Sequence, residues 1–157
     1  MYEAHAVRLT RLAVVLVGPS DSHDLVADAV MKAVGAPGWA DVEFKGAYLA
    51  RTVVHLAEDR RRQTDRRQRR ELRVGVMRRN AADNSLVDVE RALVVRAALS
   101  SLSAPQLAVV FMHYWEDVTL EQGATQLGMR VGTARTHLAR AKRRLRSVLP
   151  LEQGEST

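Results

Sequence analysis

The most constraining feature of the sequence is the spacing of small, apolar and polar residues between Thr119 and Leu138. Ala124 is small enough for two helices to cross closely, and Gly128, four positions later, tolerates the positive φ of a tight turn. After this turn, apolar residues recur at helical spacing at Val131, Ala134, Leu138, Ala141 and Leu145. The pattern predicts a helix-turn-helix whose second helix turns one apolar face inward.

The opposite face of that second helix is polar and basic. A recognition helix presents such side chains to base edges in the major groove, and neighbouring cations meet phosphates. The residues placed to read bases are Thr133, Arg135, Thr136 and Arg140. Those suited to phosphates are Lys142, Arg143, Arg144 and Arg146. An ordinary helical hairpin with a basic surface is the alternative, but the fixed offsets favour a protein that binds duplex DNA.

Positive charge is concentrated in two separate segments of the chain. Eight arginines and two acids lie between Arg60 and Arg73, and seven basic residues without an acid lie between Arg130 and Arg146. Because the whole chain carries only +6, the remaining residues are acidic on balance. Two solvated helix faces are one interpretation, but this segregation favours nucleic acid as the partner.

Composition argues against several other classes of function. The chain has no cysteine, which excludes disulfides and thiolate sites. Its five histidines are scattered, and Asp24 and Asp28 have no third metal ligand nearby. No phosphate loop or activated nucleophile occurs. We therefore expect no enzyme, no metal and no cofactor. Since no apolar stretch is long enough for a signal core or a membrane span, we expect a cytoplasmic protein without a membrane partner.

Good helix formers dominate the chain and runs of β-branched residues are short, which predicts an all-α fold. Ser20, Asp21 and Ser22 are expected to cap one of the N-terminal helices. We divide the chain into two small helical domains, residues 1–70 and 89–149, joined by a flexible linker over 71–88. A polar tail follows over 150–157.

Several motifs in both halves carry a family resemblance. The C-terminal half contains the run Leu127-Gly128 followed by Val131-Gly132-Thr133-Ala134-Arg135, and the stretches 102–111, 114–119 and 141–145. These resemble region 4 of bacterial sigma factors of the extracytoplasmic-function group, in the sigma-70 superfamily, and the first run is highly specific for that group. The N-terminal half is similar to region 2 at Tyr2-Glu3-Ala4-His5, Asp24-Leu25-Val26, Ala47-Tyr48-Leu49 and Asp59 to Arg62. The pattern around Tyr48 is similar to the actinobacterial branch.

The resemblance implies a dissociable subunit that binds core RNA polymerase and directs promoter-specific transcription initiation. In the family, region 4 reads the −35 element of promoter DNA, and the positions that inherit this role are Arg130, Thr133, Arg135, Thr136, Arg140, Lys142 and Arg143. Polymerase binding is implied for Asp24, Leu25 and Asp28, and a polymerase flap contact for Leu107, Val110 and Phe111. An anti-sigma factor is also expected from the resemblance.

Region 2 of the family recognises and melts the −10 element. The residues implied here are Tyr48, Arg51, His55, Arg60 and Arg61, with the loop over 35–43. Opening DNA requires surfaces on which freed bases stack and cations along the freed strand. Tyr48 and His55 lie two helical turns apart, so we expect both on one side of a helix. A core position for Tyr48 is the alternative.

The sequence departs from the family pattern at a few positions. Gly123 stands where an apolar residue is usual, at an expected cost of about 1 kcal/mol in helix propensity. Arg130 replaces a capping Ser, His55 replaces an Asn, and an aromatic is missing near Met31 and Val34. The alternative function is a conventional helix-turn-helix repressor or activator that is not a polymerase subunit, which would need a domain for dimerisation or ligand binding.

Overall fold

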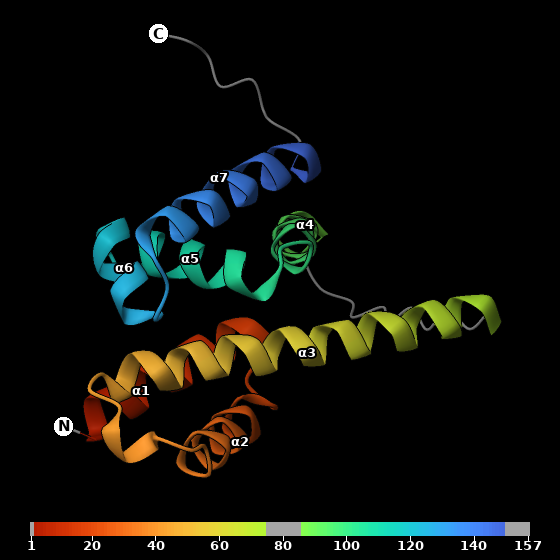
Figure 1. The fold of residues 1–157 in the computed structure, drawn as a ribbon. Helices are drawn as coiled ribbons and strands as arrows, with labels where there is room; N and C mark the ends of the chain where they lie inside the picture. The colour runs from red at the N-terminus through yellow and green to blue at the C-terminus, as the bar shows by residue number, and fades with distance from the viewer. Residues whose placement is uncertain (1, 75–85, 150–157) are drawn as a thin grey trace, which may run out of the picture.

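All regular structure is helical in the computed structural model, which describes residues 2–74 and 86–149 (Figure 1). The N-terminal half contains α1 (Tyr2–Val17), α2 (Ser22–Val34), the 3-10 helix η1 (Trp39–Asp41) and α3 (Lys45–Val74). The C-terminal half contains α4 (Leu86–Ser100), α5 (Ala104–Tyr114), α6 (Leu120–Gln126) and α7 (Val131–Val148). The predicted all-α fold is confirmed.

Helix α3 is the longest element, with 30 residues, and it continues past residue 70, where we placed the end of the first domain. Its second half consists mainly of Arg, Gln and Glu, which are good helix formers, and no glycine interrupts it before Gly75. The predicted linker over 71–88 therefore includes the end of α3 and the start of α4. The middle of that linker, residues 75–85, lies outside the described residues.

Side-chain caps explain where two helices of the C-terminal half begin. At α5, the Ser103 hydroxyl accepts the backbone N–H of Gln106 at 3.3 Å, and the side-chain Oε1 of Gln106 accepts the backbone N–H of Ser103 at 3.2 Å. At α6, Thr119 and Gln122 form the same reciprocal pair at 3.1 and 3.0 Å. Each pair satisfies two backbone donors that a helix start leaves free.

The predicted side-chain cap of α2 is wrong. Asp21 occupies the capping position with φ −102° and ψ −6°, a helical conformation rather than the extended one from which a capping side chain reaches back. Its side chain makes no capping hydrogen bond. The neighbouring Ser22 is buried, and its hydroxyl donates to the carbonyl of Pro19 at 3.0 Å.

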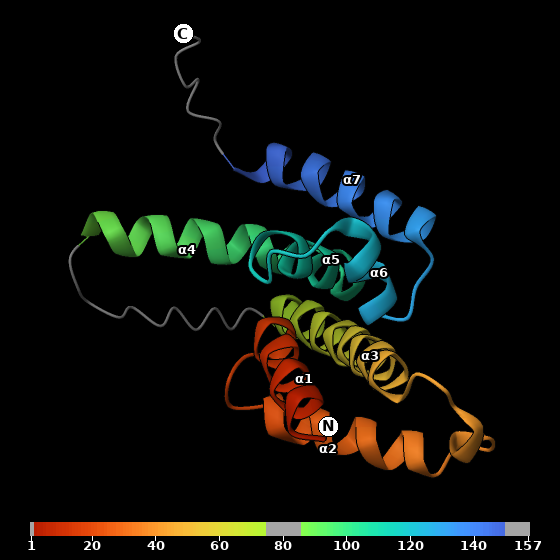
Figure 2. The ribbon, with the colours of Figure 1, turned by 90° about the vertical axis from the view of Figure 1, so that its left-hand side faces the viewer.

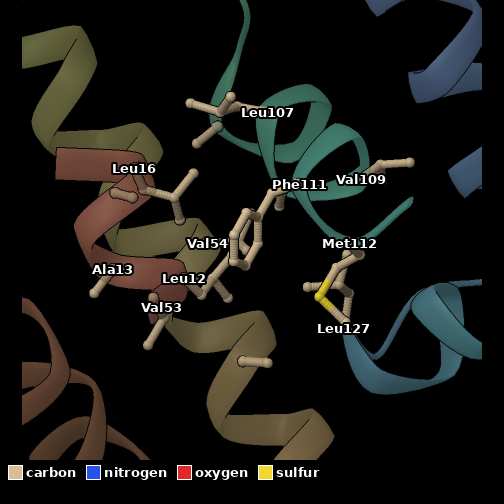
Figure 3. Close-up of a cluster of buried hydrophobic side chains, with 14 of the residues drawn as sticks. Leu12, Ala13, Leu16, Val53, Val54, Leu107, Val109, Phe111, Met112 and Leu127 are labelled. Atoms are coloured by element: carbon tan, nitrogen blue, oxygen red, sulfur yellow. The ribbon is translucent and has the colours of Figure 1, made fainter. Parts of the chain in front are cut away.

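A single hydrophobic core joins the two halves. The helices are stacked in layers, from α7 through α5 to α3 and then α2 (Figure 2). Helix α5 inserts Leu107 and Phe111 between Leu12 and Leu16 of α1 and Val54 of α3 (Figure 3). Leu12 is 1% exposed and Phe111 is 7% exposed, and burying a side chain of this size contributes about 1.5–3 kcal/mol. We call the contact between the two halves the seam.

Candidate nucleic-acid interface

The turn between α6 and α7 has the geometry predicted for a helix-turn-helix. Gly128 adopts φ +65°, as expected. The N–H of Gly128 donates to the carbonyl of Thr125 at 3.2 Å, and that of Met129 donates to the carbonyl of Ala124 at 2.9 Å. Ala124 is 1% exposed where α6 packs in the core. The turn is therefore closed by its own backbone, and it fixes α7 relative to α6.

Helix α7 has one buried face and one free face. Ala134, Leu138 and Ala141 are buried, and Val131 and Leu145 pack against the same core. The opposite face exposes Thr133, Arg135, Thr136, Arg140, Lys142 and Arg143, together with Arg130 at the start of the helix. None of the ion pairs among the described residues uses a cation of α7. This face is thus a basic surface of the shape and chemistry that a major groove accepts.

Three polar side chains of the α7 region differ in how they interact with the rest of the protein. Arg130 makes no side-chain cap, as expected for a residue that replaces Ser. The Thr136 hydroxyl donates to the carbonyl of Gly132 at 3.0 Å, so its free lone pairs can still accept. Burial, and secondarily the charge of Arg140, lowers the pKa of His137. Both effects favour the neutral imidazole, so His137 contributes little to the charge of this basic surface.

The turn of the helix-turn-helix lies directly on α3. A methyl group at Gly128 would lie 2.9 Å from the carbonyl oxygen of Ala47 and 3.4 Å from Cβ of Arg51. Glycine is therefore required at this position for two reasons, the positive φ and the close approach of the two backbones. The contact places the start of the recognition helix beside the first turns of α3.

Aromatic side chains from η1, the following loop and α3 gather near the start of α3. The ring of Tyr48 stands edge-on to Trp39 of η1 with centroids 5.6 Å apart, and the Lys45 ammonium lies 5.5 Å from the Trp39 centroid. Tyr48 is 36% exposed and Phe44 is 68% exposed, so Tyr48 is not a core residue. Arg51 and His55 are exposed on the same helix. We call this surface, formed by Trp39, Phe44, Tyr48, Arg51 and His55, the aromatic face.

Trp39 lies in the loop over 35–43 that we assigned to the −10 element, but it was not singled out, and Phe44 was not among the predicted DNA contacts. Only 4% of the chain is aromatic, yet Trp39, Phe44 and Tyr48 fall within ten residues of one another. This concentration was the available signal, because exposed aromatics such as Phe44 and Tyr48 offer stacking partners for bases, whereas Trp39 is half-buried and packs against the core.

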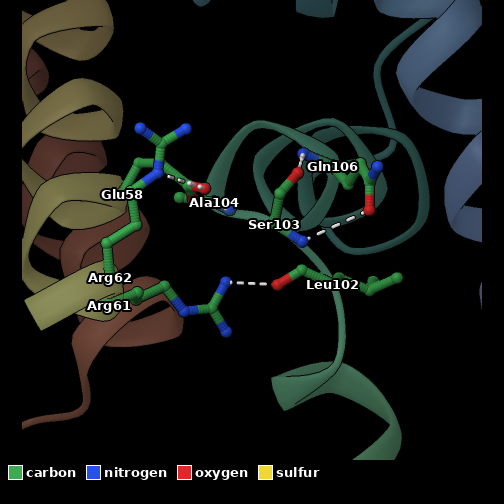
Figure 4. Close-up of polar contacts among 7 residues, drawn as sticks. All are labelled: Glu58, Arg61, Arg62, Leu102, Ser103, Ala104 and Gln106. Atoms are coloured by element: carbon green, nitrogen blue, oxygen red, sulfur yellow. Dashed lines mark hydrogen bonds and ion pairs between the residues drawn. The ribbon is translucent and has the colours of Figure 1, made fainter. Parts of the chain in front are cut away.

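Arg60 and Arg61 lie away from the aromatic face. Arg60 pairs with Asp28 of α2. Arg61 donates to the carbonyl of Leu102 at 2.6 Å across the seam (Figure 4). Burial lowers the pKa of Arg61, although the nearby carboxylates of Glu58 and Asp65 oppose the effect. Both predicted contacts of the −10 strand are therefore engaged within the protein.

Glu58 makes a second polar contact across the seam. Its carboxylate accepts the N–H of Ala104 at 2.7 Å and lies 3.7 Å from the Arg62 guanidinium (Figure 4). A carboxylate at the start of α5 also interacts favourably with the helix dipole. No sequence motif signalled Glu58, because the role depends on a partner 46 positions away.

Some of the predicted polymerase contacts are buried. Asp24 and Asp28 are exposed on α2, but Leu25 is 0% exposed and packs in the core, so its predicted surface contact is wrong. The flap contact predicted for Leu107, Val110 and Phe111 is also wrong for this structure, because all three are buried. Their apolar face packs on the N-terminal half instead.

Within residues 2–74 and 86–149, no group of three histidine or carboxylate side chains is placed to hold a metal ion. No helix in those two ranges is long and apolar enough to cross a bilayer. The described fold and surfaces define a helical DNA-binding protein of two halves, with a helix-turn-helix in one half and an exposed aromatic group in the other.

Comparison with known proteins gives the family. The model of sigma-70 region 4 matches residues 92–145. The RNA polymerase sigma-E factor of Streptomyces antibioticus is 31% identical over 134 residues, which is 83% of this chain and 72% of the relative. That of Streptomyces avermitilis is 32% identical over 133 residues, with the same shares. The chain belongs to the RNA polymerase sigma factors of the sigma-70 superfamily, in the extracytoplasmic-function group.

One solved structure has a similar fold over nearly the whole chain. It is the sigma factor RpoE of Bartonella quintana in complex with the anti-sigma factor NepR. The two proteins share 21% identity with a TM-score of 0.51, and the match covers 96% of this chain and 94% of the other. A conventional repressor or activator, the alternative function, is not favoured by these relationships.

Proposed function

We propose that this sigma factor binds core RNA polymerase and divides the promoter between two surfaces. In this proposal α7 reads the −35 element as duplex, and the aromatic face of α3 holds bases of the melted −10 element. The observation that carries the proposal is the free face of α7, on which every predicted base-reading side chain is exposed. Its cations have no ion-pair partner among the described residues.

The roles within each surface follow from side-chain chemistry. Arg135 and Arg140 offer the planar donor pair that matches the acceptors of guanine. Thr133 and Thr136 can each form a single hydrogen bond with a base edge. Arg130, Lys142 and Arg143 are assigned to phosphates. Tyr48 with Trp39 and Phe44 provides stacking surfaces, which favour unstacked bases by about 1–3 kcal/mol per base.

Arg60 and Arg61 need a further step before they can hold the −10 strand. Arg60 must leave Asp28, and Arg61 must leave the carbonyl of Leu102. Release of Arg61 requires that the seam open. We propose that opening accompanies binding to core polymerase, for which Asp24 and Asp28 offer an acidic surface.

We also propose where the chain acts and what else binds it. Nucleotide addition belongs to the polymerase, so the chain itself is not an enzyme. It would work in the cytoplasm, where the polymerase meets the chromosome. The complex of the similarly folded Bartonella quintana protein with an anti-sigma factor supports the proposal that such a factor also binds this chain.

The proposal is tested by binding to purified core polymerase. We expect the chain to copurify with core enzyme at equal stoichiometry and to bind promoter duplex only weakly without it. Run-off transcription from genomic promoter fragments should require the chain. Tight and sequence-specific binding of the isolated chain, without affinity for core enzyme, would contradict the proposal and favour a repressor.

A further inference from the structure

Thr64 is the one serine or threonine in the sequence with arginines at both the second and the third preceding positions. The run is Arg61-Arg62-Gln63-Thr64. Protein kinases choose substrates by charge patterns, and many select two arginines at this spacing, because carboxylates in the kinase groove pair with the guanidinium groups. The sequence therefore offers one acceptor hydroxyl of this kind, and the proposed function gives it no role.

The hydroxyl of Thr64 is accessible. Its side chain is exposed, and the hydroxyl donates to the carbonyl of Arg60 at 3.0 Å. This half of α3 extends beyond α1 and α2 (Figure 1), and every side chain over 62–71 is exposed. A kinase binds its acceptor segment in an extended form. Unwinding 62–71 would break only one of the ion pairs among the described residues, that between Arg62 and Glu58, so the opening is local and leaves the core intact.

Thr64 lies one helical turn after the two arginines that the protein holds in place. It follows Arg60 by four residues and Arg61 by three, so at 100° per residue its direction lies between theirs, about 40° from the first and about 60° from the second. Side chains at these spacings are neighbours on a helix. All three line one groove of about 1000 Å³, together with Arg67 one turn further on. A group attached to Thr64 would thus enter a space bordered by three guanidinium groups.

The present partners of Arg60 and Arg61 are weaker acceptors than a phosphate. Arg60 pairs with the exposed carboxylate of Asp28, and Arg61 donates to the neutral carbonyl of Leu102 (Figure 4). A phosphothreonine carries a charge of about −1.5 to −2 at pH 7 and three strong acceptor oxygens. Arginine binds phosphate through two parallel charge-assisted hydrogen bonds. A phosphate at Thr64 would therefore compete for both arginines at once.

We infer that Thr64 is a phosphorylation site and that its phosphate draws Arg60 and Arg61 away from Asp28 and Leu102. In the reaction, Oγ1 of Thr64 forms a bond to the γ-phosphorus of a nucleoside triphosphate held by the kinase. The bond from that phosphorus to the bridging oxygen breaks, and the nucleoside diphosphate leaves. The hydroxyl proton passes to a carboxylate of the kinase.

The consequence for transcription rests on the proposed function, in which Arg60 and Arg61 hold the −10 strand. In the modified chain these two arginines are neutralised by the phosphate, so the −10 strand loses two cations. Binding to core polymerase remains, because Asp24 and Asp28 stay exposed on α2. Phosphorylation of Thr64 therefore turns off promoter opening without removing the chain from the polymerase.

The first experiment measures the phosphate itself. Full-length chains with phosphothreonine incorporated at position 64 or at position 125 are titrated by phosphorus NMR. Thr125 is a matched control, because it is exposed and its hydroxyl donates to the carbonyl four residues earlier, but no arginine lies three or four positions away. The second phosphate pKa should be about 1 below its usual value near 6 at position 64, but not at position 125. Arg60→Gln should reverse part of this decrease.

The second experiment uses a purified kinase that selects this pattern. It should phosphorylate the wild-type chain at Thr64, and intact mass should show that Thr64→Val, which has nearly the same shape, does not accept this phosphate.

The third experiment compares holoenzymes with and without phosphothreonine at position 64 on a template that has a melted −10 element and lacks a −35 element. Each single-strand phosphate contact adds about 0.7 to the slope of log affinity against log salt, so loss of two lowers the slope by about 1.4. Doubling the salt should then weaken the unmodified holoenzyme about 2.6-fold more than the modified one. Phosphothreonine at position 125 should keep the unmodified slope, and affinity for core enzyme should not fall.

Four results would overturn the inference. They are an ordinary phosphate pKa at position 64, an equal decrease at position 125, equal modification of Thr64→Val by the kinase, and a loss of affinity for core enzyme on modification. A lowered phosphate pKa together with an unchanged salt slope would leave the capture of the arginines intact. It would instead contradict the −10 role that the proposed function gives to Arg60 and Arg61.

Discussion

The two surfaces that we propose for DNA differ in how completely the structure presents them. The free face of α7 contacts nothing else in the described protein, because the packing of α7 involves only the opposite face. Helix α3 packs on α1 and α2 on one side and on α5 on another, which leaves its outer side free. The surface proposed to read duplex DNA is therefore fully exposed, whereas two predicted −10 contacts, Arg61 and Arg60, are held in the seam and on α2.

This difference shows that the seam couples the two halves. Phe111 lies on α5, which packs against both α3 and α7, and Gly128 lies in the turn that leads into α7 and contacts Ala47 of α3. A change at the seam should therefore affect both halves together, while a change on either outer face should affect one function alone.

The largest expected effect comes from breaking the seam. Phe111→Ala removes a buried ring from between α1 and α3 and should lower the free energy of unfolding by about 3–5 kcal/mol. Urea unfolding measures the change. Trp115→Ala is the control, since that ring is 65% exposed, and it should change stability by no more than about 0.5 kcal/mol.

The two tryptophans also report on the halves separately, because Trp39 lies in the N-terminal half and Trp115 in the C-terminal half. Variants that retain one tryptophan each should unfold in coincident transitions when Phe111 is present. In the Phe111→Ala background the transitions should separate. Equal costs for Phe111→Ala and Trp115→Ala would show that the halves do not share a core.

A smaller effect separates base reading from phosphate binding on α7. Arg135→Ala or Arg140→Ala should weaken binding of the holoenzyme to its matched −35 element by about 1–3 kcal/mol if the arginine pairs with guanine. Lys142→Ala should instead lower the affinity for all sequences and reduce the salt slope by about one. Affinities on matched and mutated −35 sites provide the measurement. Equal losses on both sites for the arginine variants would mean that this face does not read bases.

The smallest effect is a gain in stability within the C-terminal half. A methyl group at Gly123 would lie 3.4 Å from Cβ of Met112 and 3.7 Å from Cγ2 of Val118, both ordinary contacts. Gly123→Ala should therefore raise the free energy of unfolding by about 0.8–1 kcal/mol through helix propensity. Gly128→Ala should have the opposite sign, because it combines a positive φ with a clash at Ala47. Urea denaturation of both variants tests these two predictions. A loss of stability in Gly123→Ala would contradict the first.

Local patterns made the helix-turn-helix predictable from the sequence. The turn at Gly128, the buried Ala124 and the exposed side of α7 depend on residues a few positions apart, and all three predictions are confirmed. Propensity likewise indicated an all-α chain. These features are fixed by spacing, which a single sequence displays directly.

Contacts between distant segments were not predictable in the same way. Periodicity identified the apolar side of α5, but it could not show that α1 and α3 cover Leu107 and Phe111. The resemblance assigned Leu25 to polymerase binding together with its acidic neighbours, although one helix turn carries both buried and exposed residues. The hydrogen bond from Arg61 to Leu102 joins residues 41 positions apart, a distance at which spacing gives no information.

The most direct test of the division between the two surfaces measures DNA opening by holoenzymes that carry Tyr48→Ala or Arg135→Ala. Permanganate reactivity of thymines in the −10 element reports melting, and circular dichroism establishes that both variants are folded. Tyr48→Ala should form closed complexes but show little reactive thymine on linear promoter, and a template with a melted −10 element should restore its transcription.

Arg135→Ala should instead lose closed complexes, because its defect precedes melting, and the melted template should not restore its recognition of the −35 element. This pair of results would assign opening to α3 and duplex reading to α7. If Tyr48→Ala opens linear promoter as fully as the wild type does, the aromatic face has no part in melting and the division is wrong.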